Sequence, residues 1–165
     1  MAHGTHDYED DPRNADIHIN INGELFHRDK AMVSVFDAGY VLGDGVWEGL
    51  RLHNGTIFQL DSHLSRLYEG AKALDMDIGL SPDELSARLY ETTRANNMVT
   101  GVHIRLMITR GIKATPYQDP RVTISPPTIV IIPEYKQPAE ATLTRGIRLD
   151  RKSTRLNSSH QIISY

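Results

Sequence analysis

Residues 46–60 read VWEGLRLHNGTIFQL and decide the fold, because they hold a strand, a tight turn and a second strand in succession. The turn contains Asn54-Gly55, a dipeptide that two-residue hairpin turns favour since both residues accept the left-handed backbone conformation. The same signal occurs earlier, where Asn22-Gly23 joins the alternating residues 17–21 to residues 24–26. The sequence therefore predicts two β-hairpins that contribute four strands to a sheet.

Two helices are predicted to follow the second hairpin. Asp61 or Ser62 is expected to cap the first helix, whose apolar residues recur at intervals of three and four. Ser81-Pro82-Asp83-Glu84 combines a capping box with proline at the first helical position, and Asn96-Asn97 ends this second helix. The apolar residues expected on the two buried faces are Leu64, Leu67, Tyr68, Ala71, Leu74, Leu85, Leu89 and Tyr90.

Two further strands complete the expected domain. Residues 102–109 form one of them, and the run from Thr128 to Ile132 is suited to a strand buried on both faces. The fold class is therefore α+β, with two helices packed on a mostly antiparallel sheet. We place this domain at residues 15–134.

The flanking segments have a different composition. Residues 1–14 are polar and acidic, and we interpret them as a disordered leader. The stretch from Pro133 to Thr144 is rich in Pro, Ala and Glu, which is typical of a linker, and we place the interdomain linker at residues 135–145. Residues 146–149 are expected to form the first strand of a truncated second domain.

The segment 150–165 has neither a strand nor a helix period. Residues 150–160, DRKSTRLNSSH, match the in-frame translation of a widely used sequencing adapter. Residues 161–162 would then encode the sample index, and residues 163–165 the continuation of the adapter. We hypothesise that residues 150–165 are not native and that the gene is cut off at Leu149.

Composition excludes several classes of protein. The 165 residues contain no cysteine, which removes disulfides, thiolate metal sites and a cysteine nucleophile. The net charge is −3 without a basic block, so no nucleic-acid partner is expected. No apolar run of about 20 residues and no signal peptide is present, so we expect a cytoplasmic protein without a membrane partner. The spacing of His3, His6, His18 and His27 does not match a metal site, and we interpret them as solvated.

Three local features could carry chemistry, and each has a structural alternative. The glycines at 39, 43 and 45 do not have the spacing of a dinucleotide or phosphate loop, and a close backbone turn explains them equally well. His63 and Arg66 share one helix face, where Arg66 could bind an anion or form a structural salt bridge. His103 and Arg105 share one strand face, either as an anionic-substrate site or as a solvated face.

Four motifs in order carry a family resemblance: residues 36–48 (FDAGYVLGDGVWE), residues 53–55 (HNG), residues 63–67 (HLSRL) and residues 108–111 (ITRG). Together they resemble the N-terminal half of the class IV, fold-type IV pyridoxal-phosphate-dependent aminotransferases. That family includes branched-chain amino acid aminotransferases, D-amino acid aminotransferases and aminodeoxychorismate lyases. The resemblance spans Ile17 to Leu149 and implies the N-terminal small domain of a two-domain homodimer with the cofactor between its domains.

The resemblance also implies roles for individual residues. Arg66 matches the arginine that binds the phosphate of pyridoxal 5'-phosphate. Trp47 would line the substrate pocket, and Arg105 matches the arginine that orients substrate in branched-chain enzymes. His103, which stands where those enzymes carry tyrosine, completes the expected substrate site.

Three further positions narrow the range of substrates that the resemblance implies. Leu42 also stands where branched-chain enzymes often carry tyrosine. The arginine and histidine that trap a carboxylate in D-amino acid enzymes are replaced by Thr115 and Tyr117. The resemblance thus favours transfer of an amino group between a branched-chain or related L-amino acid and 2-oxoglutarate. A D-amino acid aminotransferase and an aminodeoxychorismate lyase stay as alternatives, as does a non-catalytic binding or dimerisation half-fold.

The resemblance implies a catalytic lysine and a carboxylate near the pyridine nitrogen, both in the C-terminal half of the family. Lys152 imitates the catalytic lysine, but it follows Leu149 too soon and lies in the suspect segment. We therefore expect this 165-residue chain to be catalytically inactive, with no catalytic residue of its own.

Genomic DNA sequenced across the Leu149 boundary tests the adapter hypothesis. We expect an open frame that differs from residues 150–165 and continues for about another domain, with a lysine in a strand context. A genomic frame that encodes residues 150–165 unchanged and then stops would contradict the hypothesis and favour the half-fold.

Overall fold

The computed structural model describes residues 10–137, 144 and 146. Residues 11–137 form one compact unit, in which all the helices and strands below lie. Most of the expected leader, the expected strand at residues 146–149 apart from Gly146, the adapter segment and Lys152 fall outside the described residues.

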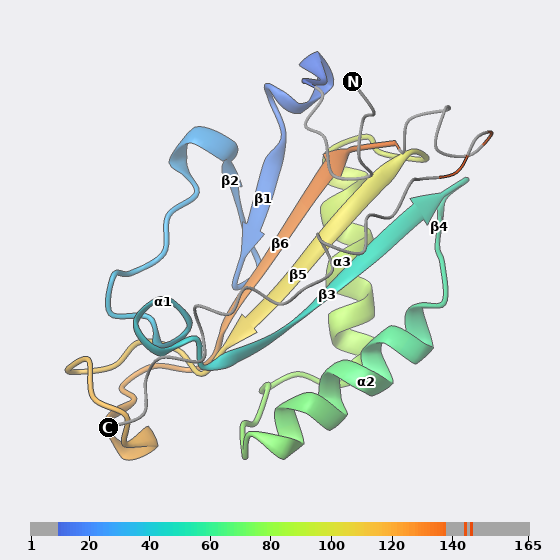
Figure 1. The fold of residues 1–165 in the computed structure, drawn as a ribbon. Coiled ribbons are helices and arrows are strands. Elements are labelled where there is room, and N and C mark those ends of the chain that lie inside the picture. Colours follow the sequence, from blue (N-terminus) through green and yellow to red (C-terminus); the bar gives the residue numbers. More distant parts are fainter. Residues whose placement is uncertain (1–9, 138–143, 145, 147–165) are drawn as a thin grey trace. The chain divides into compact units, whose positions relative to one another are not determined.

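Six antiparallel strands form one sheet in the order β2-β1-β6-β5-β3-β4 (Figure 1). The strands are β1 (His18–Ile21), β2 (Glu24–His27), β3 (Gly45–His53), β4 (Thr56–Ile57), β5 (Val102–Thr109) and β6 (Thr128–Tyr135). The helices are α1 (Ala38–Leu42), α2 (Leu60–Ala73) and α3 (Pro82–Ala95), with short 3₁₀ turns at Pro12–Asn14, Arg28–Lys30 and Pro120–Val122. Both predicted hairpins are confirmed, as is the α+β class, but β5 and β6 separate the two hairpins within the sheet.

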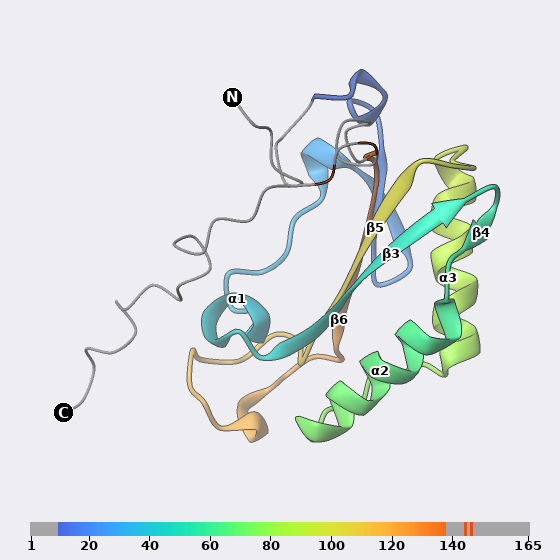
Figure 2. The same cartoon turned by 45° about the vertical axis from the view of Figure 1, so that its right-hand side comes forward.

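The two faces of the sheet are covered differently. Helices α2 and α3 pack on one face, whereas α1 and the segment that precedes it lie on the other side (Figure 2). The core lies under the two long helices, where apolar side chains alternate inward along each central strand. Its fully buried members include Leu50, Leu85, Leu89, Val102, Ile104, Leu106, Ile108 and Ile131.

Helix α2 begins earlier than the sequence indicates. Gln59 occupies the N-cap position with φ +53°, so neither Asp61 nor Ser62 caps the helix. This early start shortens β4 to two residues. Leu64, Leu67 and Ala71 are buried as predicted, but Leu74 follows the helix and is 41% exposed, so its assignment to the buried face was wrong.

Helix α3 begins and ends as predicted. The Ser81 hydroxyl accepts the Glu84 N–H, and the Glu84 carboxylate accepts the Ser81 N–H at 2.7 Å. Asn96 is the C-cap, and its side chain also bonds to both backbone groups of His18 on β1. The helix end is thereby attached to the sheet.

The boundaries of the domain also differ from the expectation. Pro12–Asn14 was assigned to the disordered leader, yet the Asn14 side chain accepts the Tyr135 N–H at 2.8 Å and donates to the Tyr135 carbonyl at 2.9 Å. Strand β6 continues through Pro133 to Tyr135, which the composition assigned to a linker. Proline fits there because β1 pairs with β6 only at Val130 and Ile131, so no strand partner on that side requires an N–H from Pro133.

The glycine-rich segment is a close turn, in agreement with the structural alternative. A Cβ at Gly39 would lie 2.3 Å from Thr109 Cγ2, and one at Gly45 would lie 2.6 Å from the Ile108 carbonyl oxygen. Asp44 next to them pairs with Arg110, which also donates to two carbonyls at the end of α2. The segment therefore brings β3 and α1 tightly against the end of β5.

Replacing the N-cap of α3 tests this account of the helix. Ser81→Ala removes an acceptor for the Glu84 N–H, and we expect the free energy of unfolding to fall by about 1 kcal/mol. The free energy of unfolding is measured by urea unfolding. The fluorescence of Trp47, the one tryptophan of the chain, reports the transition. Ser86→Ala, in the interior of the same helix, is the matched control and should not destabilise the protein. Equal stability of Ser81→Ala and the unchanged protein would refute the capping role.

Candidate functional site

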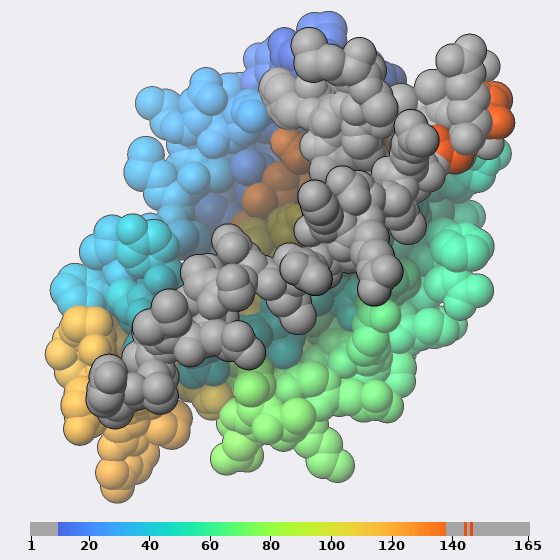
Figure 3. Space-filling view, viewed as in Figure 1, coloured from blue at the N-terminus to red at the C-terminus, as the bar shows by residue number. Residues whose placement is uncertain are grey.

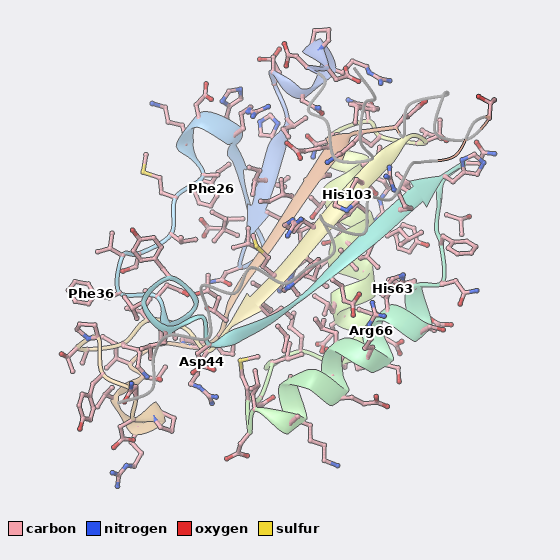
Figure 4. The ribbon with its side chains drawn as sticks, viewed as in Figure 1. Phe26, Phe36, Asp44, His63, Arg66 and His103 are labelled. Atoms are coloured by element: carbon pink, nitrogen blue, oxygen red, sulfur yellow. The ribbon has the colours of Figure 1, made fainter. Side chains whose placement is uncertain are left out.

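A buried carboxylate holds the two polar residues predicted on α2. Arg66 donates from Nε to Glu48 Oε1 at 2.7 Å and from Nη2 to Glu48 Oε2 at 2.5 Å. His63 Nδ1 lies 2.8 Å from the same Oε2 atom, so it donates to the carboxylate through its Nδ1–H. Figure 4 shows His63 and Arg66 side by side on α2, next to β3. The structural salt bridge that the sequence left open is thus present.

The electrostatics of this group favour the charged forms. The side chain of Glu48 is 4% exposed. Hydrogen bonds from Arg66 and, to a smaller extent, from His63 hold the pKa of Glu48 below its usual value, although burial opposes them. The pKa of Arg66 is raised by the same pairing. The carboxylate is therefore ionised at neutral pH and fixes the plane of the guanidinium.

Arg66 retains donors for a ligand. Its side chain is 69% exposed, and its Nη1 atom makes no hydrogen bond to any described residue. A guanidinium carries five N–H donors in a rigid fork that fits phosphate and carboxylate oxygens. The free side of the fork can therefore bind an anion while Glu48 holds the other side.

Glu48 was not singled out from the sequence. A signal was present, because Glu48 alternates in step with Val46, Leu50 and Leu52, which face the helices. A carboxylate on the buried face of a strand needs a cationic partner. The nearest helix offers His63 and Arg66 for that role.

The three residues predicted to bind substrate meet on the opposite face of the sheet. The guanidinium carbon of Arg105 lies 4.8 Å from the centre of the Trp47 ring, within the range of a cation–π contact. Gly49 is the β3 partner of Arg105, and a Cβ there would lie 3.2 Å from His103 Nε2 and 3.8 Å from the Trp47 ring. The missing side chain at Gly49 therefore gives the imidazole and the indole room to converge.

Next to Trp47 and Arg105, the face of the sheet opposite α2 and α3 has an apolar hollow. A cavity of about 500 Å³ lies between the sheet and the segment that includes α1. Trp47, Arg105 and Tyr40 are among the residues that line it, and the strands contribute apolar side chains to it. Those side chains are Ile19, Ile21, Met107, Val130 and Ile132. In the space-filling view, the surface of β6 is recessed beside the blue segment before α1 (Figure 3).

The arrangement can bind a small molecule that carries both a carboxylate and an apolar chain. Arg105 supplies a cation that a carboxylate would recognise, and the neighbouring hollow would take an apolar chain. Burial lowers the pKa of His103, and the nearby cations Arg51, Arg105 and Lys136 lower it further. The imidazole is therefore neutral at physiological pH in the free protein.

The structure separates Arg66 from the other predicted residues. Trp47 and Glu48 are neighbours on β3 and point to opposite faces, so Arg66 lies on the helix side and His103 with Arg105 on the other. The separate positions of Arg66 and His103 are visible in Figure 4. The two parts of the candidate site share β3, which contributes Glu48 to one part and Trp47 to the other.

Other ligand classes have no support in the part of the chain that the structure describes. Within it, no three His, Asp or Glu side chains are grouped so that they could hold a metal ion. His27 lies 3.6 Å from Asp16 and 3.7 Å from Asp29, in a largely exposed group. The described helices include none with the length and apolar character needed to cross a bilayer.

Comparison with known proteins identifies the family. The profile of the amino-transferase class IV family matches residues 45–163, and the chain belongs to this family. Class IV aminotransferases use pyridoxal phosphate. The matched range includes residues 150–163, so the genomic sequence across the Leu149 boundary also decides whether that part of the match belongs to the gene.

The relatives that the chain resembles are named for two different activities. "Branched-chain-amino-acid aminotransferase-like protein 1" of Arabidopsis thaliana is 38% identical over 153 residues, covering 93% of this chain and 27% of its own. D-alanine aminotransferase of Listeria monocytogenes is 37% identical over 130 residues, covering 79% of this chain and 40% of its own. A solved branched-chain aminotransferase from the thermophilic archaeon Thermoproteus uzoniensis, with norvaline, is 26% identical with a TM-score of 0.61.

Coverage is partial in every one of these cases. The solved structure aligns with 72% of this chain but only 40% of its own chain. The chain thus spans between 27% and 40% of the length of these relatives. The fold corresponds to the N-terminal domain of fold-type IV aminotransferases, as the resemblance implies.

Neutralising Glu48 tests the buried group. We expect Glu48→Gln to lower the free energy of unfolding at pH 7 by about 1 kcal/mol, because the charge-assisted bonds to Arg66 and His63 are lost. The pKa of Glu48 is lower in the folded state, so its contribution is present above its unfolded pKa and disappears as the pH falls through the folded value. Urea unfolding at several pH values measures the difference.

Glu91→Gln, an exposed substitution in α3, is the control and should leave stability unchanged. If Glu48→Gln still lowered the free energy of unfolding at acid pH, Glu48 would act through packing instead of charge.

Proposed function

We propose that the gene product is a pyridoxal-phosphate-dependent aminotransferase in which this chain supplies the cofactor phosphate site and part of the substrate site. The observation that carries the proposal is Arg66, whose exposed guanidinium is held in place by a buried carboxylate. Membership of the class IV family supports it. The proposal includes a cytoplasmic homodimer, as the family resemblance implies.

The residues present fit the phosphate of the cofactor. An anion at the free side of Arg66 would share the guanidinium with Glu48, which keeps the fork planar and oriented. His63 donates to Glu48 and limits the rotation of that carboxylate. Arg66 would therefore bind the phosphate, while Glu48 and His63 position it.

The open face supports an amino acid or 2-oxo acid as substrate. Arg105 would bind a carboxylate, Trp47 would cover the substrate, and the hollow beside them would take an aliphatic side chain. This combination favours a branched-chain or related L-amino acid with 2-oxoglutarate as amino acceptor. His103 would offer a hydrogen-bonding ring nitrogen where branched-chain enzymes carry a phenol.

The chemistry itself requires groups beyond those described. When bound, pyridoxal phosphate supplies an electron sink for the carbanion that forms at the substrate's Cα. The family resemblance assigns the Schiff-base lysine to the C-terminal half. We therefore propose that the 165-residue chain by itself binds phosphate and carboxylate ligands but does not catalyse amino transfer.

The alternatives differ in measurable ways. A D-amino acid aminotransferase is supported by the Listeria relative, but Thr115 and Tyr117 stand where the family's carboxylate trap would be. An aminodeoxychorismate lyase would release an aromatic amine without an amino acceptor. A binding or dimerisation half-fold would catalyse none of these reactions. Assays of the full-length gene product with L-leucine, D-alanine and aminodeoxychorismate separate the three enzymes.

Binding of pyridoxine 5'-phosphate tests the phosphate site. This compound carries the cofactor's phosphate but no aldehyde, so it does not react with surface lysines. We expect binding by isothermal titration calorimetry, with at least about tenfold weaker binding of unphosphorylated pyridoxine. Arg66→Gln should remove this preference for the phosphorylated compound.

Arg94→Gln, an exposed substitution near the end of α3, is the matched control and should retain the preference. Equal binding of both compounds to the unchanged chain, or no binding of either, would contradict the proposed cofactor site.

A further inference from the structure

His103 lies in a field of fixed positive charge on the open face. Its cross-strand partner on β3 is Arg51, and Arg105 is two residues along β5 on the same face. Lys136 follows β6 and adds a third cation to the electrostatic environment of His103. The cross-strand partner of His103 on β6 is Glu134, which places a carboxylate on the same face of the sheet. Among the described residues, three cations thus act on one half-buried imidazole whose strand partner on β6 is acidic.

One hydrogen bond and one glycine shape this arrangement. Arg51 Nη1 donates a hydrogen bond to the Lys136 carbonyl, which ties the end of β6 to β3. The imidazole lies over Gly49, where a Cβ would approach His103 Nε2 at 3.2 Å. The absence of a side chain at Gly49 therefore leaves room for the ring beside Arg51 and Arg105.

We propose that binding of a carboxylate ligand at Arg105 is coupled to protonation of His103, so that the ligand enters together with a proton from solvent. This inference rests on the proposed function, since it deepens the carboxylate site assigned above. The ligand class is a monocarboxylate or dicarboxylate with an aliphatic chain. His103 acts as a positioning residue that becomes a second cation toward the bound carboxylate.

The coupling follows from the sign of the charges. In the free protein, burial and the three cations favour neutral imidazole and hold the pKa of His103 below its usual value. A bound carboxylate brings a negative charge that offsets the cations, which favours the imidazolium and raises that pKa. Because linkage is reciprocal, protonation of His103 must strengthen ligand binding by the same factor.

The direction of the pH dependence is therefore fixed. Affinity for the carboxylate increases as the pH falls from the bound-state pKa of His103 toward the free-state pKa. One proton is involved, so the change is at most about tenfold per pH unit. A tyrosine at this position would be uncharged over the same range and would give no such dependence.

Calorimetry with 4-methylpentanoate tests the proposal on the complete chain. Titrations between about pH 5.5 and 7, where histidine titrates, are run in imidazole and in Bis-Tris buffers. These buffers are cationic, so they do not compete for the anion site, and their ionisation enthalpies differ. We expect binding that strengthens as the pH falls and an observed heat that depends on the buffer, corresponding to uptake of a fraction of a proton.

Variants separate this coupling from a merely structural role. His103→Gln and His103→Tyr should each bind the probe with no proton uptake and no pH dependence, and either one that folds suffices. His18→Gln, which changes an exposed histidine on β1, should retain the coupling.

Two results would overturn the inference, and they have different meanings. Binding of 4-methylpentanoate by the unchanged chain without proton uptake contradicts the role of His103 but leaves the carboxylate site intact. Absence of binding at every pH contradicts the carboxylate site and with it the substrate part of the proposed function.

Discussion

The alternation of side chains along β3 is the constraint on which the rest of the structure depends. Its even-numbered residues enter the core under α2 and α3, and its odd-numbered residues face the open side. Glu48 and Trp47 are therefore committed to opposite faces by one backbone register. A shift of that register by one residue would exchange them, exposing Leu50 and burying Arg51. The pairing of β3 with β5 along eight residue pairs fixes the register.

The buried carboxylate explains how β3 is connected to both of the proposed ligand sites. Burying an unpaired carboxylate is unfavourable, so Glu48 requires Arg66 and His63. This requirement ties α2 to β3 and orients a guanidinium with donors to spare. On the other face, Gly49 removes a side chain at the point where Trp47, His103 and Arg105 converge. Arg66 and Arg105 thus present separate cations, one proposed for a phosphate and one for a carboxylate.

Local signals predicted most elements, and each error has a physical cause. The hairpin turns and the capping box of α3 depend on nearest neighbours, so they were predicted correctly. The start of α2 was misplaced because Gln59 adopts a left-handed conformation without a side-chain cap. Asn14 and Pro133 were assigned to flexible segments because their composition is polar or proline-containing, whereas contacts far along the chain order them. The same limit explains why Glu48 was overlooked, since its partners follow 15 and 18 residues later.

The sequence by itself determined the class of fold, the two hairpins, the two long helices and the family, because periodicity, turn residues and ordered motifs are local properties. It also determined which residues share a face, as His63 with Arg66 and His103 with Arg105. Only the tertiary structure decided that β5 and β6 separate the hairpins, that Arg66 pairs with Glu48, and that Trp47 meets Arg105. These facts depend on strand order and on contacts between distant segments, which are set by how the buried faces pack together and leave no local pattern in the chain.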